Sequence, residues 1–271
     1  MIVLSLLAAV FVTVAIGLRV PPRPFPPHPE SEGALARVPL PANLPAPVER
    51  FYRDLYGDEV PVIESAVITG RATLRIAGLT FPARFRFSHD AGRAYRHDIE
   101  ATLYGLPIMR VDERFIDGAS RLELPFGVVE HEPKVDQAAN LGLWAESIWL
   151  PAIFLTDERV RWEAVDDETA ILRVPGPSGV PGEAEECFVV RFDPHHGRPH
   201  LFEAMRYKGA DSATKTLWLN DAVRWGTIDG RTMLTVGTLT WFGDPGPWAE
   251  FRVEEVVYGV DVTPYLQPTG P

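Results

Sequence analysis

The chain has 271 residues, of which 46% are hydrophobic and 23% charged, a composition typical of a globular protein with ample material for a core. Its formal net charge of −11 argues against a nucleic-acid partner and against electrostatic docking on anionic lipid, because both depend on lysine and arginine. Cys187 is the only cysteine, which excludes an intrachain disulfide and a thiolate metal site.

The N-terminal residues 2–18 carry no charge, and Arg19 follows them directly. As a helix this segment approaches the thickness of a hydrocarbon core. No lysine or arginine precedes it, which disfavours a cleaved signal peptide, although Ala15–Gly17 offers a cleavage site as an alternative. We therefore predict that residues 1–18 form a transmembrane helix, with the membrane as partner and a single-pass membrane localisation.

The side of the membrane is open on this pattern. Arg19, Arg23 and Arg37 all follow the span, and the positive-inside rule would place the rest of the chain in the cytoplasm. Long domains are translocated largely regardless of such charges, so we favour the extracytoplasmic side.

Residues 19–47 are rich in proline, which predicts a stiff, extended linker. Residues 48–57 then show helical spacing of apolar side chains and end at Gly57, which predicts a short helix. From Val60 onwards apolar and polar residues alternate, as in half-buried strands. We predict a single antiparallel β domain over residues 48–271.

Turn signals separate the expected strands. Asp117-Gly118 and Asp229-Gly230 suit tight hairpins, and Asp90–Gly92 marks another turn. The pattern indicates about ten to twelve strands, nearly all joined by hairpins, and therefore a meandering antiparallel sheet.

One stretch interrupts this pattern, "LGLWAESIWLPAIFL" at residues 141–155. Together with the residues before it, it predicts a helix over 136–150 that ends before Pro151. The helix is apolar on all sides, which indicates a buried helix. The hollow of a curved sheet is the place to bury it, so we expect a mainly β fold, an open barrel or half-barrel with this helix in its hollow.

Several short segments resemble an uncharacterised bacterial family of membrane-anchored domains of unknown function. The family has an Ala-Glu-x-x-Trp-x-Pro helix followed by a Trp-Glu strand. The segments that carry the resemblance are "LPAPVERFY" (44–52), "AESIWLPAIFL" (145–155), "VRWEAVDDETA" (160–170), "VVRFDPHHG" (189–197) and "AMRY" (204–207). The resemblance implies an architecture and little chemistry. The overall plan is also similar to lipoprotein-carrier half-barrels, which shelter acyl chains, by fold analogy alone.

Glu146 is the main candidate for a functional residue, because an ionised carboxylate on a buried helix needs a partner. It either contacts a ligand or accepts a proton, or it forms a structural pair with an arginine such as Arg206 or Arg161. The further candidates for ligand binding are three tryptophans and the end of the "AMRY" segment: Trp144, Trp149, Trp162, Arg206 and Tyr207.

Two other groups of residues are rejected. His195, His196 and His200 lack the spacing of a metal site and are assigned to an exposed turn. Asp112 and Glu113 are adjacent on a strand and point to opposite sides, so they cannot act together on a glycosidic bond, and Asp117 lies in a turn. We predict no metal, no cofactor and no catalytic residue from recognised motifs.

Three functions remain. The first is a membrane-tethered domain that binds an apolar or lipid-like ligand in a cavity beside the 136–150 helix. The second is an enzyme that uses Glu146 as a general acid or base, and the third is a non-catalytic partner in envelope assembly. A continuous apolar cavity favours the first, a titratable neighbour at hydrogen-bond distance from an unpaired Glu146 favours the second, and a filled core favours the third.

Overall fold

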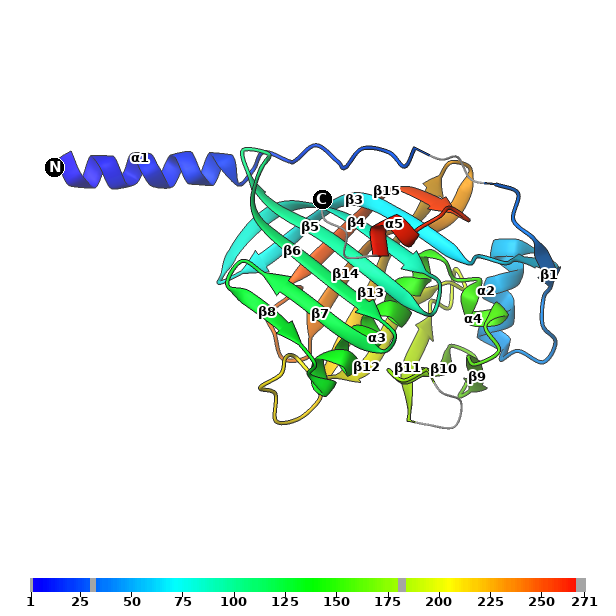
Figure 1. Ribbon diagram of the computed structural model, residues 1–271. Helices are drawn as coiled ribbons and strands as arrows, with labels where there is room; N and C mark the ends of the chain where they lie inside the picture. The colour runs from blue at the N-terminus through cyan, green and yellow to red at the C-terminus, as the bar shows by residue number, and fades with distance from the viewer. Residues whose placement is uncertain (1, 30–32, 180–183, 267–271) are drawn as a thin grey trace.

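The computed structural model describes residues 2–29, 33–179 and 184–266, and its main element is one large antiparallel sheet (Figure 1). Its 13 strands follow the order β8-β7-β6-β5-β4-β3-β15-β14-β13-β12-β11-β10-β9, so neighbours in the chain are mostly neighbours in the sheet. A mainly β, antiparallel, meandering fold was expected, and it is confirmed.

Each strand of the large sheet runs antiparallel to its neighbours. The strands are β3 (Ser65–Ile76), β4 (Leu79–Asp90), β5 (Ala94–Leu103), β6 (Leu106–Ile116), β7 (Ala119–Leu124), β8 (Gly127–Glu130), β9 (Arg161–Ala164), β10 (Thr169–Pro175), β11 (Glu185–Phe192), β12 (Pro199–Arg206), β13 (Thr216–Ile228), β14 (Arg231–Trp241) and β15 (Ala249–Tyr258). Two short strands, β1 (Arg37–Pro39) and β2 (Glu59–Pro61), pair separately. The described residues also form the helices α1 (Ile2–Gly17), α2 (Ala46–Tyr56), α3 (Pro133–Glu146), α4 (Ile153–Thr156) and α5 (Thr263–Leu266) and the 3₁₀ turn η1 (Ser147–Trp149).

The hairpins form where the turn residues predicted them. Asp117 and Gly118 have φ of 52° and 79°, and Asp229 and Gly230 have φ of 49° and 78°. Two consecutive residues with positive φ match the right-handed twist of the strands on either side. Strand β8, of four residues, extends the meander at one edge of the sheet.

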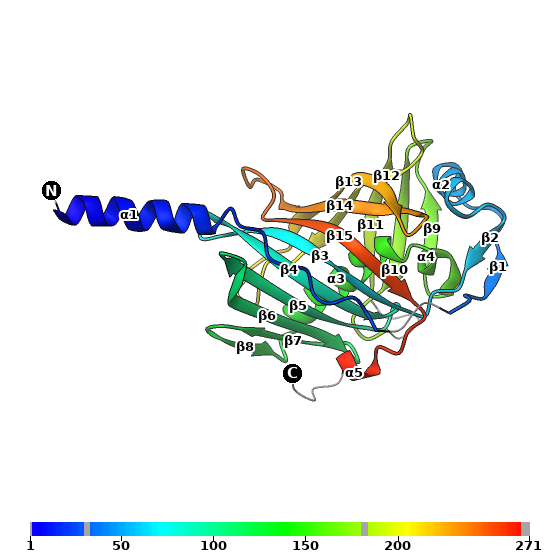
Figure 2. The same cartoon turned by 90° about the horizontal axis from the view of Figure 1, so that it is seen from above.

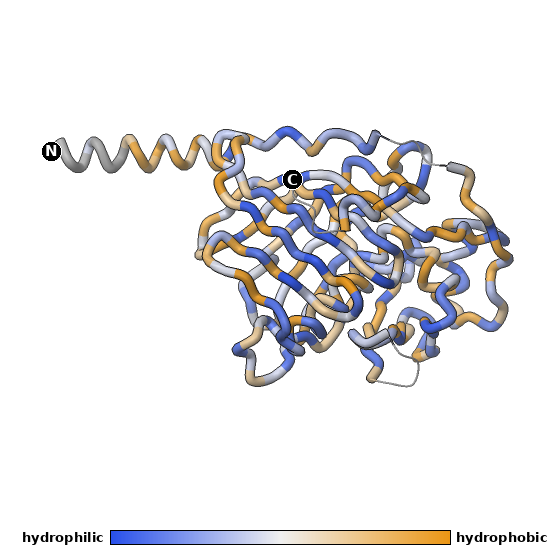
Figure 3. The backbone as a smooth tube through the Cα atoms, viewed as in Figure 1, coloured by the Kyte–Doolittle hydropathy of each residue, from blue (hydrophilic) through white to orange (hydrophobic). Residues whose placement is uncertain are grey.

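The sheet curves around helix α3. This helix contacts β6 and β7 near one edge of the strand order and β12 near the other. Strands so far apart in a sheet can reach one helix only if the sheet bends, as Figure 2 shows. Hydrophobic and hydrophilic residues alternate along the strands (Figure 3), and the hydrophobic ones form the main core cluster between the sheet and α3, η1 and α4.

Helix α3 differs from its expected bounds at both ends. It begins at Pro133 rather than at residue 136, because proline is well suited to the first turn of a helix. It ends at Glu146, where η1 tightens the chain before Pro151. Every residue from 137 to 145 is buried, as the uniformly apolar pattern predicted.

The prediction of a transmembrane helix at residues 1–18, and with it a single-pass membrane localisation, is wrong. Helix α1 has 16 residues, which at about 1.5 Å per residue fall short of a hydrocarbon core of about 30 Å. Among the described residues, no helix is long and apolar enough to cross a membrane. Helix α1 instead projects from the sheet (Figure 1).

The proline-rich segment after α1 lies along the sheet (Figure 1). Phe25 packs under the guanidinium groups of Arg84 and Arg86, whose carbons lie 4.4 and 4.8 Å from the centre of its ring. Such cation–π contacts attach the segment to β4. The division into residues 1–18, 19–47 and 48–271 stays a prediction.

Candidate functional site

A cavity of about 100 Å³ lies between the concave side of the sheet and the end of α3. Its lining is mainly aromatic and aliphatic, with a few polar groups. The lining residues are Phe87, Tyr95, His97, Ile99, Glu113, Gly142, Ala145, Glu146, Ile148, Trp149, Phe202, Arg206, Trp218, Asn220, Asp221, Ala222, Leu234, Gly237, Thr238, Leu239, Trp248 and Phe251.

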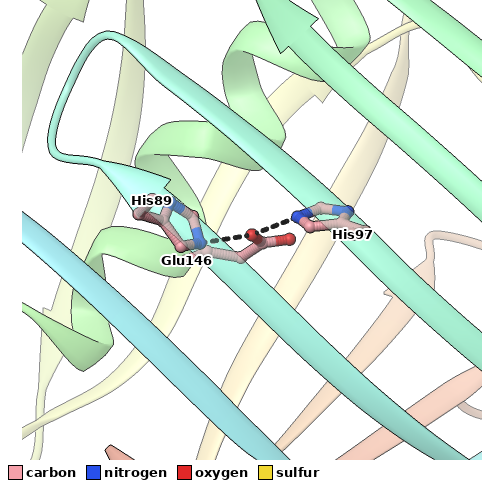
Figure 4. Close-up of side chains that lie close together, drawn as sticks. All are labelled: His89, His97 and Glu146. Carbon is pink, nitrogen blue, oxygen red and sulfur yellow. Dashed lines mark hydrogen bonds and ion pairs between the residues drawn. The ribbon is translucent and has the colours of Figure 1, made fainter. Parts of the chain in front are cut away.

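Two histidines converge on Glu146 at this cavity. His97 Nε2 lies 2.7 Å from Glu146 Oε2 and is hydrogen-bonded to it. His89 Nε2 lies 3.1 Å from the same oxygen, and the carboxylate stands between the two rings (Figure 4). The side chain of His89 is completely buried, whereas that of Glu146 is 17% exposed.

Strand register brings the histidines together. Strands β4 and β5 form a hairpin in which His89 pairs with Tyr95, and Phe87 pairs with His97. Alternate residues of a strand face the same side, so Phe87 and His89 on β4 and Tyr95 and His97 on β5 all point inwards. Glu146 reaches them from the last turn of α3.

The ring of His97 is held in a fixed orientation. Tyr95 stacks on one side with ring centroids 4.0 Å apart and planes 15° apart, and Phe87 packs with a centroid distance of 4.0 Å. Glu113 lies opposite His97 on β6, with its Oε2 3.7 Å from His97 Nδ1. The hydroxyl of Tyr95 donates a hydrogen bond of 2.7 Å to Glu113.

The charges of this cluster stabilise one another. Burial favours the neutral form of His97, but the charge of Glu146 and the hydrogen bonding of both carboxylates outweigh it and raise the pKa of His97 to about 9. Burial likewise opposes ionisation of Glu146, but the charge of His97 and the contact with His89 lower the pKa of Glu146 to about 2. At neutral pH the pair is therefore an imidazolium and a carboxylate.

Two further groups tune the site. Burial raises the pKa of Tyr95 well above its ordinary value, and the charge of Glu113 adds to this, so Tyr95 remains a donor. Burial opposes ionisation of Glu113 too, but the nearby His97 and the hydrogen bond from Tyr95 hold its pKa below the ordinary value. Glu146 also ends α3, where the helix dipole disfavours an anion and favours a neighbouring cation.

Arg206 supplies a positive group on another wall of the cavity. Its guanidinium carbon lies 4.2 Å from the ring centroid of Trp218, and burial lowers its pKa. Its Nε is buried and has no hydrogen-bond partner among the described residues. This arginine therefore has donor capacity that a ligand could use.

The structure brings together three of the six residues predicted from the sequence for ligand binding. Glu146, Trp149 and Arg206 line the cavity. The other three lie elsewhere: Trp144 is buried beside a separate pocket, Trp162 donates a hydrogen bond of 3.2 Å to the carbonyl of Phe154, and Tyr207 lies under Lys134 and Lys215.

Neither arginine named as a partner of Glu146 forms an ion pair with it among the described residues. Arg206 lines the same cavity as Glu146, and Arg161, on the edge strand β9, forms surface ion pairs with Glu185 and Glu163. Histidines take the place of the arginine. Glu146 is partly buried and contacts both imidazoles, and its structural or functional role stays a prediction.

The sequence reasoning missed His89, His97, Glu113 and Tyr95. The sequence held a signal for His89. Phe85, Phe87 and His89 are every second residue of one strand, so they lie on the same face, and a histidine on an apolar face points inwards. Asp112 and Glu113 do face opposite sides as predicted. Asp112 pairs with Arg96 and Arg114, and Glu113 faces the cavity.

Within the part of the chain that the structure describes, His89, His97 and Glu146 could share one metal ion, because their ligand atoms lie within 4.8 Å of one another. The arrangement thus combines an apolar cavity, a buried nitrogen–oxygen donor set and an unsatisfied arginine. It defines a curved-sheet protein with a potential ligand site beside a buried helix.

The chain belongs to the DUF6544 family, a family of unknown function whose profile matches residues 35–253. This agrees with the resemblance noted in the sequence to a family of domains of unknown function. Comparison with the curated proteins gives no match.

Two solved structures are similar at low sequence identity. A LolA superfamily protein from Nitrosomonas europaea is 10% identical, with a TM-score of 0.47 over 82% of this chain and 96% of that one. A DUF1329 family protein from Desulfovibrio piger is 13% identical, with a TM-score of 0.41 over 77% of this chain and 91% of that one. These overlaps are too loose for a ligand or an activity to be carried over.

Proposed function

We propose that this protein binds a small amphipathic ligand, with an apolar body and an anionic end, in the cavity beside α3. The observation that carries the proposal is the cavity itself, which is lined mainly by aromatic and aliphatic side chains and contains a few convergent polar groups. This combination is typical of small-molecule sites.

The apolar part of the ligand is assigned to the region around Trp149 and Phe251. Their ring centroids lie 6.4 Å apart, and Phe87 stands 6.0 Å from Trp149 and 5.4 Å from Phe251. Such rings present flat, weakly hydrated surface at little cost in side-chain entropy. An acyl chain or a small ring would displace little bound water there.

The anionic end is assigned to Arg206. A carboxylate or phosphate accepts hydrogen bonds from a guanidinium in a fork, and Nε of Arg206 has no partner among the residues described. Trp218 stacks on the guanidinium and would hold it in place. A neutral hydrocarbon would leave this donor unsatisfied.

The size of the cavity limits the ligand. A volume of about 100 Å³ is smaller than the engineered cavity of about 150 Å³ that holds benzene. In this conformation the cavity accommodates a short alkyl segment such as the end of an acyl chain. A complete two-chain lipid is excluded.

The other two functions are less well supported. Glu146 is paired with His97, and a carboxyl group with a pKa of about 2 is a poor general acid or base at neutral pH. A cavity beside the helix also weighs against the filled core expected of a purely structural assembly partner.

The first test fills the cavity. A Cβ atom at Gly142 would meet only Tyr95 Oη, at 3.6 Å, so Gly142→Leu extends a side chain into open space, and Gly142→Ala is its matched control. The measurement is calorimetric titration with a short-chain fatty acid, supported by native mass spectrometry of the purified protein. We expect binding to be lost in Gly142→Leu and kept in Gly142→Ala. Equal binding by both variants would refute the site.

The second test removes the assigned anion contact. Arg206→Met should weaken binding of the fatty acid by about tenfold or more, because a charged hydrogen bond contributes about 1.5–3 kcal/mol. Arg224→Met removes a charge from an exposed position on β13 that does not line the cavity, and it should leave binding unchanged. The same loss in both variants would mean that only the overall charge matters.

A further inference from the structure

We propose that His89, His97 and Glu146 form a binding site for one divalent transition-metal ion at the edge of the cavity. The sequence alone predicted no metal site, and the present inference does not depend on which organic ligand the cavity takes. Two imidazole nitrogens and one carboxylate oxygen are a common donor set for Zn²⁺ and Fe²⁺ in proteins.

The strongest observation is the state of His89. Its side chain is completely buried, and neither ring nitrogen makes a hydrogen bond among the described residues, although Nε2 lies 3.1 Å from Glu146 Oε2. Buried polar groups are almost always hydrogen-bonded, so an orphaned histidine inside a core needs an explanation. A metal ion bound to Nε2 would satisfy it.

The positions of the donor atoms suit a shared ion. Two ligand atoms that are each about 2.1 Å from an ion stand about 3.0 Å apart at a right angle and about 3.4 Å apart at the tetrahedral angle. His89 Nε2 lies 3.1 Å from Glu146 Oε2, within this range, whereas His97 Nε2 lies 2.7 Å from it, a hydrogen-bond distance that would lengthen slightly around an ion. At 3.1 Å from the carboxylate oxygen, His89 Nε2 is not aligned for a hydrogen bond to it. Such an orientation is expected of a nitrogen whose lone pair points at a metal ion.

The surroundings of His97 resemble the outer shell of a metal site. A histidine ligand usually presents its second nitrogen to a carboxylate, which fixes the tautomer and the orientation of the ring. Here Nε2 faces Glu146, while Nδ1 faces Glu113 at 3.7 Å. Tyr95 stacks on the same ring and holds Glu113 through its hydroxyl. The carbonyl end of α3 adds a partial negative charge beside the ion.

A simple ion pair does not account for the whole arrangement. The hydrogen bond between His97 and Glu146 would be complete without His89, and burying a second imidazole that contacts the same carboxylate oxygen without hydrogen-bond alignment contributes little stability. A bound ion uses all three side chains. Because His97 and Glu146 also line the cavity, the remaining coordination positions would face it and take water or the anionic end of a ligand.

The test is titration of the full chain, after removal of bound metal with a chelator, by Zn²⁺ in a calorimeter and by Co²⁺ in an absorption spectrometer. We expect one ion per chain and visible Co²⁺ bands typical of nitrogen and oxygen ligands. His89→Gln and Glu146→Gln should each weaken Zn²⁺ binding by about 100-fold or more, since even outer-shell changes cost 10–100-fold. Circular dichroism of each variant establishes that it is folded.

The matched controls are His195→Gln and His196→Gln, which alter the other histidine pair of the chain at an exposed turn. They should leave Zn²⁺ affinity unchanged. The proposal is overturned if the wild-type chain binds no stoichiometric metal. It is overturned equally if binding survives in folded His89→Gln and Glu146→Gln or is lost only in the two controls. The wild-type titration decides the question even if a cluster variant fails to fold.

Discussion

Two regions of this molecule contain a carboxylate with two histidines, and they have opposite characters. In the turn between β11 and β12, Asp193 accepts hydrogen bonds from the backbone amides of His195 and His196, at 2.9 and 2.8 Å, and both histidines are exposed. At the cavity, Glu146 instead faces the side chains of His89 and His97, which lie on different strands and are buried.

The difference teaches how a protein makes a site. Histidines adjacent in sequence diverge on a turn, and the aspartate near them is used to fix the local backbone. Histidines eight residues apart on a hairpin converge, because the register of the strands places them on one face. The carboxylate that joins them comes from a helix nearly fifty residues further along the chain. The following predictions test this contrast in order of decreasing effect.

Glu146→Gln should have the largest effect on stability. Removing one member of a buried ion pair leaves the other charge uncompensated, which typically costs about 3–5 kcal/mol. Because Glu146 keeps some solvent contact and His97 can release its proton, we expect a loss of about 3 kcal/mol. Urea unfolding of chelator-treated protein measures it. Unchanged stability would mean that the pair contributes nothing to the fold.

The double substitution Glu146→Leu with His97→Leu sharpens that result. Replacing both members of a buried pair with apolar residues is often neutral or stabilising, so much of the lost stability should return. A double variant less stable than Glu146→Gln would show that the cost comes from packing rather than from charge.

Tyr95→Phe should have an intermediate effect. The change removes the hydroxyl that donates to Glu113 but keeps the ring stacked on His97. Hydrogen bonds to charged groups contribute about 1.5–3 kcal/mol, and we expect a loss of about 2 kcal/mol in urea unfolding. No loss would indicate that water replaces the hydroxyl at Glu113.

Gly142→Ala should stabilise the chain slightly. Gly142 lies within α3, and a Cβ atom there has room. Replacing such a glycine restricts the unfolded chain and favours folding by about 0.4–1 kcal/mol. A higher melting temperature in calorimetry would agree. Destabilisation would show that the cavity wall is tighter at this point than the distances imply.

His195→Gln and His196→Gln should have the smallest effect. Both side chains are exposed, and Asp193 contacts the backbone rather than the rings. Substitutions of this kind usually change stability by less than about 0.5 kcal/mol. A larger change in thermal unfolding would mean that the turn contributes more than its backbone hydrogen bonds.

The fold was largely predictable, and the site only in part. Alternation along the strands and turns such as Asp229-Gly230 are local signals, and they foretold the antiparallel meander. The uniformly apolar helix pattern likewise indicated a buried helix and singled out Glu146. The partners of Glu146 depend on which strands the helix end reaches, and that follows from the curvature of the whole sheet.

The errors have physical reasons of the same kind. An uncharged run at the N-terminus indicated a membrane span, but the helix that forms has only 16 residues. Trp144 and Trp162 were grouped with Trp149 by residue type alone. Whether a tryptophan lines a cavity depends on its direction from the helix or strand, and residue type does not encode it.

The most direct test of the ligand site is a crystal structure of the chain with a short brominated fatty acid, measured at the bromine absorption edge. The proposal predicts an anomalous bromine peak within the cavity near Trp149 and Phe251, with the carboxylate at Arg206, and no such peak for Gly142→Leu. A peak confined to the outer surface, or an empty cavity at saturating concentrations of the fatty acid, would contradict it.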